Sequence, residues 1–448
     1  MNSQHFDTIV VGSGTSAYFV VDTLNRAGKK VAIIDERPYG GTCALRGCQP
    51  KKYLVCNAEA VAQASHLVGK GISTPPQTDW KALQALKNEF LNGRSENEVK
   101  DWQAAGVSTF HGSAKFTGPN KLVVENNHLS AHHIVLATGA TPRRSEFPGN
   151  EHIKVSNDFL KLPDLPPRII FIGGGYISFE FAHIAKRAGA SEVTIIHRSD
   201  RPLKAFDPDV VATVIAAGRN EGIQVRLNET PVEVQSMEPG LRLKTSTGDE
   251  YDADLIIEAT GRVPNLSVLG QGQGNVASKA NGILVNEFLQ STSNPQVYAV
   301  GDCAATPYML APVADQEGKT AAQNILQGNQ HTVDYSVIPS AVFTIPSIGS
   351  VGLNEEQAQA EGIDFRVNKG TTTGWPSSKR IGEQHSFYKI LINNQTNEIL
   401  GAHLARHNAS EAINILALAM KFHIKAPDLA EFMWAYPTIT SDLKYMVK

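Results

Sequence analysis

Cys43 and Cys48 are the residues of this sequence best suited to redox chemistry. They lie close together in the run Gly40-Gly41-Thr42-Cys43-Ala-Leu-Arg-Gly47-Cys48-Gln-Pro50-Lys51-Lys52. Two cysteines at this spacing can form a disulfide without spanning a domain. We expect a helix to begin at Cys48, and a helix N-terminus stabilises a thiolate and lowers its pKa. The run therefore predicts a redox-active pair.

Zinc binding is the competing interpretation of a close cysteine pair. A structural zinc site would need two further ligands, and Cys56 and Cys303 do not form a second close pair. Cysteines outside disulfides are among the most buried residue types. We therefore expect Cys56 and Cys303 to be buried and unreactive, and we predict no metal site.

A first glycine fingerprint predicts a nucleotide-binding turn. Gly12 and Gly14 follow the apolar run 8–11 and precede an expected helix from Thr15 to Ala27. Such glycines form a tight turn that exposes backbone N–H groups to a pyrophosphate. Asp35, at the end of the next expected strand, can accept hydrogen bonds from the ribose of an adenosine. The alternative is an ordinary strand-to-helix turn, which also favours glycine.

A second unit of the same kind follows the expected strand 168–172. Gly173 and Gly175 form its turn, and its second strand ends at Arg198, with Lys204 nearby. An NAD site usually carries an acid there, which would repel a 2′-phosphate, whereas a guanidinium can clamp one bidentately. The pattern favours NADPH, and the alternative is that both charges are merely solvated.

The size and charge of the chain limit its possible functions. Its 448 residues suffice for three domains of about 150 residues. With 41 Lys and Arg against 44 Asp and Glu, it lacks the basic excess typical of partners of nucleic acids or membrane surfaces. No apolar run approaches the ~20 residues of a membrane span. We expect no signal peptide, no secreted disulfide scaffold and a cytoplasmic location.

The order of the elements predicts an α/β fold. Alternating strands and helices in both glycine units indicate parallel sheets covered by helices on both faces. The proline-rich stretch 162–167 suggests a hinge into the second domain. From about Ile338 the pattern changes to short strands and then a helix from Glu411 to Phe422, which indicates a separate α+β domain.

These motifs together resemble those of the class I pyridine nucleotide–disulfide oxidoreductases, which include glutathione reductase, dihydrolipoamide dehydrogenase and mercuric reductase. The resemblance covers essentially the whole chain. Besides the cysteine run it rests on four segments: 173–180, 259–265, 298–302 and 342–349. It implies two Rossmann-like domains and a C-terminal dimerisation domain, namely an FAD-binding domain at 1–147 and 265–337, an NAD(P)H-binding domain at 148–264 and an interface domain at 338–448.

The resemblance also implies an enzyme in which NADPH reduces FAD and electrons then pass to Cys48, which frees Cys43 as the exchanging thiolate. Lys51 is expected to pair with Glu180 beside the flavin, although an ordinary surface ion pair is the alternative. Tyr176 is expected over the flavin, or else in plain core packing. The family forms a homodimer in which one subunit completes the active site of the other. The implied residues for FAD and NADPH together are Gly12, Gly14, Asp35, Glu36, Gly41, Thr42, Lys52, Thr138, Gly139, Gly173, Gly175, Tyr176, Arg198, Lys204, Gly261, Arg262, Gly301 and Asp302.

The C-terminal catalytic motif departs from the family pattern. The disulfide reductases carry His-Pro-Thr-x-x-Glu, where this chain has Tyr436-Pro437-Thr438-Ile439-Thr440-Ser441, followed by Asp442. Histidine titrates near pH 6.5 and tyrosine near 10, and losing a positioned acid–base group typically costs about 10²–10⁴-fold. Tyr436 is therefore expected to act as a proton donor, and not as the usual acid–base group.

Three functions remain open at this stage. The first is reduction of a disulfide or related sulfur-bonded substrate. Glutathione disulfide is not favoured, because Asp22 lies in the stretch where glutathione reductases carry an arginine. The second is electron delivery to a metal ion or a quinone, and the third is a slow redox-sensing flavoprotein.

Overall fold

The computed structural model describes residues 3–266 and 271–448. Residues 267–270, within the predicted segment 265–337, lie outside this description. The chain divides into two units, each assembled from three separate stretches. The first comprises Met1–Lys52, Ala85–Arg143 and Arg262–Tyr335, and the second comprises Tyr53–Gln84, Arg144–Gly261 and Ser336–Lys448.

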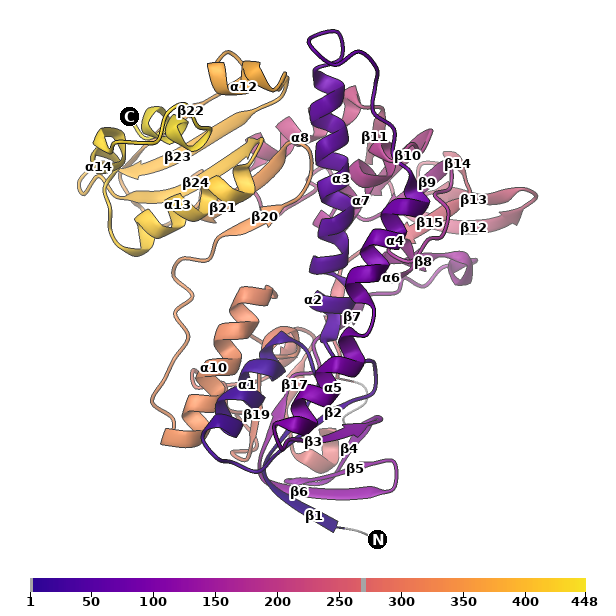
Figure 1. Cartoon of the computed structure of the whole chain (residues 1–448), viewed down its shortest axis with the longest axis vertical. Helices are drawn as coiled ribbons and strands as arrows, with labels where there is room; N and C mark the ends of the chain where they lie inside the picture. Colours follow the sequence, from indigo (N-terminus) through magenta and orange to yellow (C-terminus); the bar gives the residue numbers. More distant parts are fainter. Residues whose placement is uncertain (1–2, 267–270) are drawn as a thin grey trace. The chain divides into compact units, whose positions relative to one another are not determined.

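A largely parallel sheet forms the centre of the first unit (Figure 1). Its strands in spatial order are β3 (Ser108–His111), β2 (Val31–Asp35), β1 (Ser3–Val11), β6 (Asn127–Leu136), β5 (Lys121–Val124) and β4 (Ala114–Gly118), with β19 (Val297–Ala299) paired to β6. β1, β2, β3, β6 and β19 run parallel, and β4 and β5 form an antiparallel extension. All of β2 is buried, as expected for a strand covered on both faces.

Two helices pack side by side on this sheet (Figure 1): α1 (Thr15–Arg26) and α10 (Ala311–Gln327). The buried positions of α1, such as Ala17, Val20 and Leu24, recur with helical spacing and point into the core. α10 approaches closely because a Cβ at Gly318 would lie 2.3 Å from the backbone oxygen of Ser16. The remaining elements of this unit are α2 (Gly41–Arg46), α5 (Arg94–Ala104), the pairs β7 (Ala140–Pro142) with β16 (Arg262–Pro264) and β17 (Ser278–Lys279) with β18 (Gly282–Ile283), α9 (Gln271–Gly274) and the 3-10 turn η2 (Gly301–Cys303).

Two helices contribute residues to both units. They are α3 (Cys48–His66) and α4 (Trp80–Leu91). No helix among the described residues combines the length and the apolar character that a membrane span requires.

The second unit contains a parallel sheet and an antiparallel sheet, and the strands of the antiparallel sheet lie between β11 (Ile223–Leu227) and β15 (Leu255–Glu258) in the sequence. The parallel strands in spatial order are β11, β10 (Glu192–His197), β9 (Arg168–Ile172), β15 and β8 (Lys154–Val155), accompanied by η1 (Asn150–His152), α6 (Ser156–Phe159), α7 (Tyr176–Arg187) and α8 (Pro208–Asn220). The antiparallel strands are β12 (Pro231–Met237), β13 (Gly240–Thr245) and β14 (Glu250–Ala253).

The C-terminal part of the second unit is an α+β structure. Its antiparallel strands in spatial order are β20 (Ser340–Val342), β21 (Ser347–Gly352), β24 (Ile399–Arg406), β23 (Phe387–Asn393) and β22 (Phe365–Gly370). Its helices are α11 (Glu355–Ala360), α12 (Pro376–Arg380), α13 (Ala409–Lys421), α14 (Ala426–Glu431), η3 (Thr440–Asp442) and α15 (Leu443–Met446).

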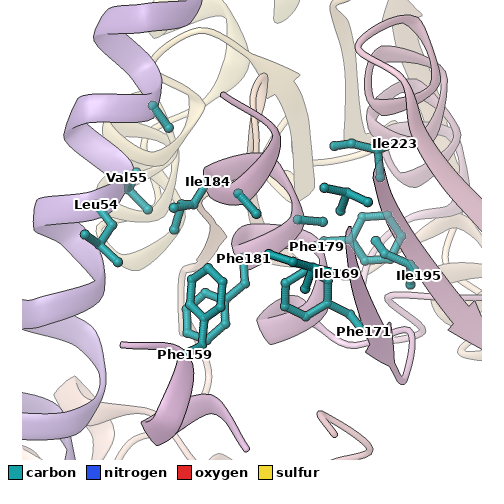
Figure 2. Packing of buried hydrophobic residues seen from close by; sticks show 14 of the residues in the cluster. Leu54, Val55, Phe159, Ile169, Phe171, Phe179, Phe181, Ile184, Ile195 and Ile223 are labelled. Atoms are coloured by element: carbon teal, nitrogen blue, oxygen red, sulfur yellow. The ribbon is translucent and has the colours of Figure 1, made fainter. Parts of the chain in front are cut away.

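One hydrophobic core joins the parallel sheet of the second unit to its C-terminal strands. Figure 2 shows the aromatic centre, where Phe159 stacks on Phe181 with ring centroids 4.4 Å apart and contacts the edge of Phe171. Leu54 reaches this core from α3. Val342, from β20, belongs to the same cluster. The predicted α/β class, with two parallel sheets and an α+β C-terminal part, is confirmed.

A buried ammonium group reinforces this connection. Lys389 on β23 is almost fully buried, and its Nζ lies 2.9 Å from Asp207, 2.7 Å from Asp209 and 2.6 Å from Glu355. Asp207 also caps the N-terminus of α8 by accepting a hydrogen bond from the backbone N–H of Asp209. Lys389 therefore holds the start of α8, which directly follows the loop that contains Arg198 and Lys204.

One detail of the predicted organisation is wrong. The stretch 162–167 does not precede the second parallel sheet, because β8 already pairs with β15 at residues 154–155. This stretch instead connects α6 to β9, and both of these elements belong to the second unit. The backbone oxygen of Leu162 accepts a hydrogen bond from Trp80 Nε1. Prolines mark a chain that cannot continue a regular element, but they do not distinguish a loop within a domain from a hinge between domains.

Candidate functional site

The cysteine pair lies at a junction between two helices. Cys43 lies in α2, the chain breaks at Gly47, and α3 begins at Cys48 as predicted. The Cys43 thiol is half-buried and hydrogen-bonded to Cys48. This hydrogen bond, burial and the negative charge of Asp315 raise the pKa of Cys43, while Lys51 opposes them. The fold therefore brings the two sulfur atoms together.

Glycines place the cysteine pair against the first nucleotide turn. A Cβ at Gly41, which has φ of +67°, would lie only 2.4 Å from Cα of Gly14. Gly12 has φ of +110°, and a Cβ there would lie 2.2 Å from the backbone oxygen of Ala137. Both positions therefore exclude any side chain. The two predicted motifs, which are separate in the sequence, meet at backbone contact.

Asp35 stabilises this turn from within. One of its oxygens accepts hydrogen bonds from the backbone N–H and the hydroxyl of Ser13, at 2.9 and 2.6 Å, and the other accepts from the N–H of Arg37 at 2.9 Å. The hydroxyl of Ser13 in turn accepts a hydrogen bond from the N–H of Gly40. Sequence reasoning missed Ser13, and its place between the two fingerprint glycines was the only signal for it.

Two half-buried arginines near Asp35, namely Arg37 and Arg46, have buried guanidinium nitrogens that fit an anionic cofactor. Among the described residues, none accepts a hydrogen bond from Nε of Arg37 or from Nε and Nη2 of Arg46, and these atoms are buried. Burial lowers the pKa of Arg46, and so do the neighbouring charges of Arg37 and Arg262, whereas Asp35 opposes them. Buried charged donors call for an anionic acceptor, and a pyrophosphate would supply one. Sequence reasoning did not identify Arg37 or Arg46.

A buried carboxylate holds the turn that contains Asp302, an expected cofactor-binding residue. Glu317 on α10 is fully buried and accepts hydrogen bonds from the N–H of Gly301 at 2.7 Å and the hydroxyl of Tyr335 at 2.8 Å. Gly301 begins the turn η2, which presents Asp302. Burial raises the pKa of Asp302, and Arg262 opposes that effect. Glu317 is thus a positioning residue for Asp302 that the sequence did not reveal.

The other residues implied for cofactor binding in this unit differ in burial and in their hydrogen bonds. Thr138 is buried and donates a hydrogen bond to the backbone oxygen of Asn265 at 2.8 Å. Arg262 donates to the backbone oxygen of Ala140 at 2.5 Å. Gly139 adopts φ of +66°. Thr42 and Lys52 are half-buried, whereas Glu36 is exposed and follows Asp35 directly.

The second fingerprint forms a turn of the same geometry in the second unit. A Cβ at Gly173 would lie 2.4 Å from the backbone oxygen of Ala259, and one at Gly174 would lie 2.5 Å from the ring of His197. Gly175 precedes α7 as its N-cap, so the N-terminus of α7 is open to a ligand. Gly174 is a residue that sequence reasoning missed, although its place between the two fingerprint glycines signalled it.

The charged residues expected at the NADPH phosphate are exposed. Arg198 and Lys204 both lie at the surface of the loop between β10 and α8. Tyr176, the first residue of α7, is 48% exposed, so core packing does not explain it. Gly261 closes the second unit with φ of +127°.

Glu180 and Tyr436 belong to the second unit, whereas Lys51 and Cys43 belong to the first. Glu180 is buried, and its Oε1 accepts a hydrogen bond from the backbone N–H of Phe343 at 2.9 Å. Tyr436 is 74% exposed. The predicted pairings of Lys51 with Glu180 and of Tyr436 with Cys43 stay predictions.

The carboxylate of Asp442 is engaged in other hydrogen bonds and so does not take the role of the glutamate in the family motif. Its Oδ2 accepts hydrogen bonds from Arg406 at 2.8 Å and from Ser377 at 2.5 Å, and Arg406 is buried. Ser441, at the glutamate position itself, donates to the backbone oxygen of Thr438. Tyr436 therefore begins a segment whose acidic residue, Asp442, serves the internal packing of the C-terminal part.

The two remaining cysteines differ from each other. Cys303 is fully buried, as expected, and burial raises the pKa of its thiol. Cys56 is exposed on α3, so the expectation of burial was wrong there. Periodicity along α3 decides this, because Leu54 and Val55 take the core-facing positions. Within residues 3–266 and 271–448, no group of three or more His, Cys, Asp or Glu side chains is arranged to hold a metal ion.

Comparison with known proteins identifies the family. Residues 6–318 match the model of the pyridine nucleotide-disulphide oxidoreductases, and residues 338–447 match the dimerisation domain of the same family. The chain belongs to this family. Its members are FAD-dependent NAD(P)H disulfide oxidoreductases, so this flavoprotein is an enzyme, and its dimerisation domain implies a homodimer.

Individual relatives agree on the family but differ in substrate. A glutathione reductase from Burkholderia cepacia is 31% identical over 99% of this chain and 98% of its own length. A dihydrolipoyl dehydrogenase from Chlamydia muridarum is 32% identical over 98% and 95%. The HOCl-induced flavoprotein disulfide reductase RclA from Escherichia coli, solved as a Cu(II) complex, has a TM-score of 0.90 at 25% identity and covers 100% of this chain and 99% of that one.

The position of Glu317 generates a prediction about the stability of the first unit. Glu317→Ala should leave two donors, the buried Gly301 N–H and the half-buried Tyr335 hydroxyl, without their acceptor. Each such loss costs about 1–3 kcal/mol, so the variant should melt at a lower temperature and retain less FAD after gel filtration. Tyr335→Phe, which removes only one donor, is the control and should have a clearly smaller effect. Equal melting temperatures for Glu317→Ala and wild type would contradict this role.

Proposed function

We propose that this enzyme uses NADPH to reduce a disulfide or a related sulfur-bonded substrate other than glutathione disulfide, through FAD and the pair Cys43–Cys48. The observation that carries the proposal is the hydrogen-bonded cysteine pair packed against the first nucleotide turn. Two electrons would break the Cys43–Cys48 disulfide and give two thiols. The substrate disulfide would then take these electrons, become two thiols and restore the Cys43–Cys48 bond.

The first unit offers the residues that would hold FAD. FAD, when bound, accepts a hydride and passes two electrons on to the cysteine pair. The N–H groups around Gly12 and Gly14 and the buried guanidinium nitrogens of Arg37 and Arg46 suit its pyrophosphate. Asp35 would contact the adenosine ribose, and Asp302 would contact the ribityl chain. Lys51 and Glu180 would act at the flavin if the two units bring them together.

The second unit supports a preference for NADPH. The turn of Gly173 and Gly175 would hold the cofactor pyrophosphate at the start of α7. Arg198 and Lys204 are exposed. Asp200 is the single acidic residue between the end of β10 and Lys204. Two cations at this strand end suit a 2′-phosphate. Tyr176, exposed at the start of α7, would cover the flavin and move aside for the nicotinamide.

Tyr436 is proposed as the proton donor to the leaving thiolate of the substrate. Its exposure leaves the phenol accessible to a second subunit. Further exposed apolar side chains of the dimerisation domain, such as Phe422, Phe432 and Met433, support burial of this face in a homodimer. In that arrangement Tyr436 of one subunit would complete the cysteine site of the other.

A metal ion is the second candidate acceptor. The similar flavoprotein disulfide reductase RclA was solved as a Cu(II) complex, and reduction of a metal ion needs no proton donor in place of the missing histidine. A quinone fits the same argument about protons, and a slow redox-sensing role is the remaining alternative. The substrate experiments below separate these functions.

The central experiment tests whether the cysteine pair exchanges electrons with the flavin. Anaerobic titration of the FAD-loaded protein with NADPH should produce a long-wavelength thiolate–flavin charge-transfer band, and Cys48→Ser should abolish it. Turnover of disulfides should fall to background in Cys43→Ser. No band in the wild type would exclude the proposal. Turnover of Cu(II) or quinones that survives Cys43→Ser, with every disulfide inert, would favour the second candidate.

The role of Tyr436 is tested by separating the two half-reactions. Tyr436→Phe should slow the reduction of the sulfur substrate by about 10²–10⁴-fold, because the phenolic proton is lost. Flavin reduction by NADPH in stopped flow should be unchanged. Tyr445→Phe is a matched control, since Tyr445 is also exposed and also lies beside Lys444. Equal substrate rates in Tyr436→Phe and wild type would remove Tyr436 from the mechanism.

The preference for NADPH is tested at Arg198. Hydrogen bonds to a charged group contribute about 1.5–3 kcal/mol, so Arg198→Ala should raise KM for NADPH by roughly 10–100-fold. KM for NADH should change little. Arg201→Ala is the control from the same loop, because Arg201 is engaged with Glu356 at 3.4 Å. Similar increases for both cofactors in Arg198→Ala would mean that this residue does not read the 2′-phosphate.

A further inference from the structure

Two histidines face each other across adjacent strands at the amino end of the first sheet. His5 on β1 and His132 on β6 are both exposed, and their Nε2 atoms lie 3.3 Å apart. Their rings are nearly perpendicular, with centroids 4.6 Å apart. β1 and β6 are parallel and in register, with His5 opposite Ser130. A rigid ladder therefore holds the two imidazoles together.

Ser130 orients the His5 ring. Its hydroxyl lies 2.9 Å from Nδ1 of His5 and also donates to the backbone oxygen of Gln4 at 3.5 Å. In the tautomer that carries its proton on Nδ1, His5 donates a hydrogen bond to this hydroxyl. A neutral imidazole carries only one N–H, so in that tautomer Nε2 of His5 has a lone pair on the side of His132. Metal-bound histidines are held in the same way, by a partner on the other ring nitrogen.

The distance between the two nitrogens suits one coordination geometry. Zn–N bonds of about 2.0–2.1 Å at a tetrahedral angle place two ligand nitrogens about 3.3–3.4 Å apart. Two adjacent ligands in a square plane with bonds of about 2.0 Å would be about 2.8 Å apart. The observed 3.3 Å, at which the two nitrogens share a hydrogen bond when one of them is protonated, matches the tetrahedral value.

We propose that His5 and His132 bind a divalent transition-metal ion, with Zn(II) best matched by the geometry and water completing the coordination. Two neutral imidazoles leave the ion with its full charge, and the nearby Lys30 ammonium, which donates to the backbone oxygen of His5, is a further cation. Binding is therefore reversible, in contrast to that of a closed structural zinc site.

The site is separate from the redox centre. His5 lies seven residues before Gly12, and at about 3.3 Å per residue the strand between them spans roughly 23 Å. A metal ion at this place cross-links β1 to β6 and acts on the stability of the sheet. It does not lie on the electron path through Cys43 and Cys48.

The test is a Zn(II) titration of the oxidised, FAD-loaded protein in competition with a chromophoric chelator. The oxidised state keeps Cys43 and Cys48 in a disulfide, so that they cannot bind the ion. His5→Ala and His132→Ala should each weaken binding at least tenfold, and Ser130→Ala should weaken it less. His128→Ala is the matched control, because His128 is an exposed histidine on the same strand and the same side of β6.

Thermal melting supplies a second readout. Zn(II) should raise the melting temperature of the wild type and of His128→Ala but not that of His5→Ala or His132→Ala. Flavin content confirms that each variant is folded. The inference is overturned if His5→Ala and His132→Ala bind Zn(II) as tightly as the wild type, or if His128→Ala loses binding equally.

Discussion

The backbone contact between Gly14 and Gly41 is the constraint on which the redox site of the first unit depends. It leaves 2.4 Å for a Cβ at Gly41, so no other residue type fits there without displacing a turn. The contact joins two segments with different tasks. Gly14 ends the turn that opens α1, and Gly41 begins the short helix that carries Cys43. A cofactor seated at the first turn would therefore be adjacent to the cysteines through backbone packing, without a flexible arm.

Buried charges around this contact divide into two groups. Asp35 and Glu317 have their acceptor oxygens engaged by hydroxyls and backbone N–H groups, and they hold the turns in place. Arg37 and Arg46 instead present buried N–H groups that no described residue accepts. Leaving such donors unmet costs free energy in the protein alone. The unit is thus arranged so that an anionic dinucleotide contributes to its stability as well as to its chemistry, and the apoprotein should be the less stable form.

The sequence predicted those parts of the structure in which short local patterns decide the outcome. Both glycine turns, the helix start at Cys48 and the change of fold near residue 338 follow from nearest-neighbour rules of turns, caps and periodicity. It did not predict partners that are distant in the chain. Glu317 supports Gly301 across sixteen residues, and Lys389 meets Asp207 across a far longer interval. The exposure of Cys56 shows the same limit, because the burial of a helical position depends on which face meets the core.

The substrate is the least determined feature, and the reason is physical. Relatives at nearly equal identity to this chain carry the names of enzymes that act on different substrates. In the proposed mechanism the group that would face the exchanging thiol is the phenol of Tyr436, which lies at an exposed position. Asp442 is bound to Arg406 and Ser377, so no carboxylate from this motif is available to polarise the phenol. An unassisted phenol can donate a proton but is a weak base at neutral pH. This arrangement favours acceptors whose reduction needs one proton delivered to a good leaving group, or no proton at all, over those that depend on repeated acid–base cycling.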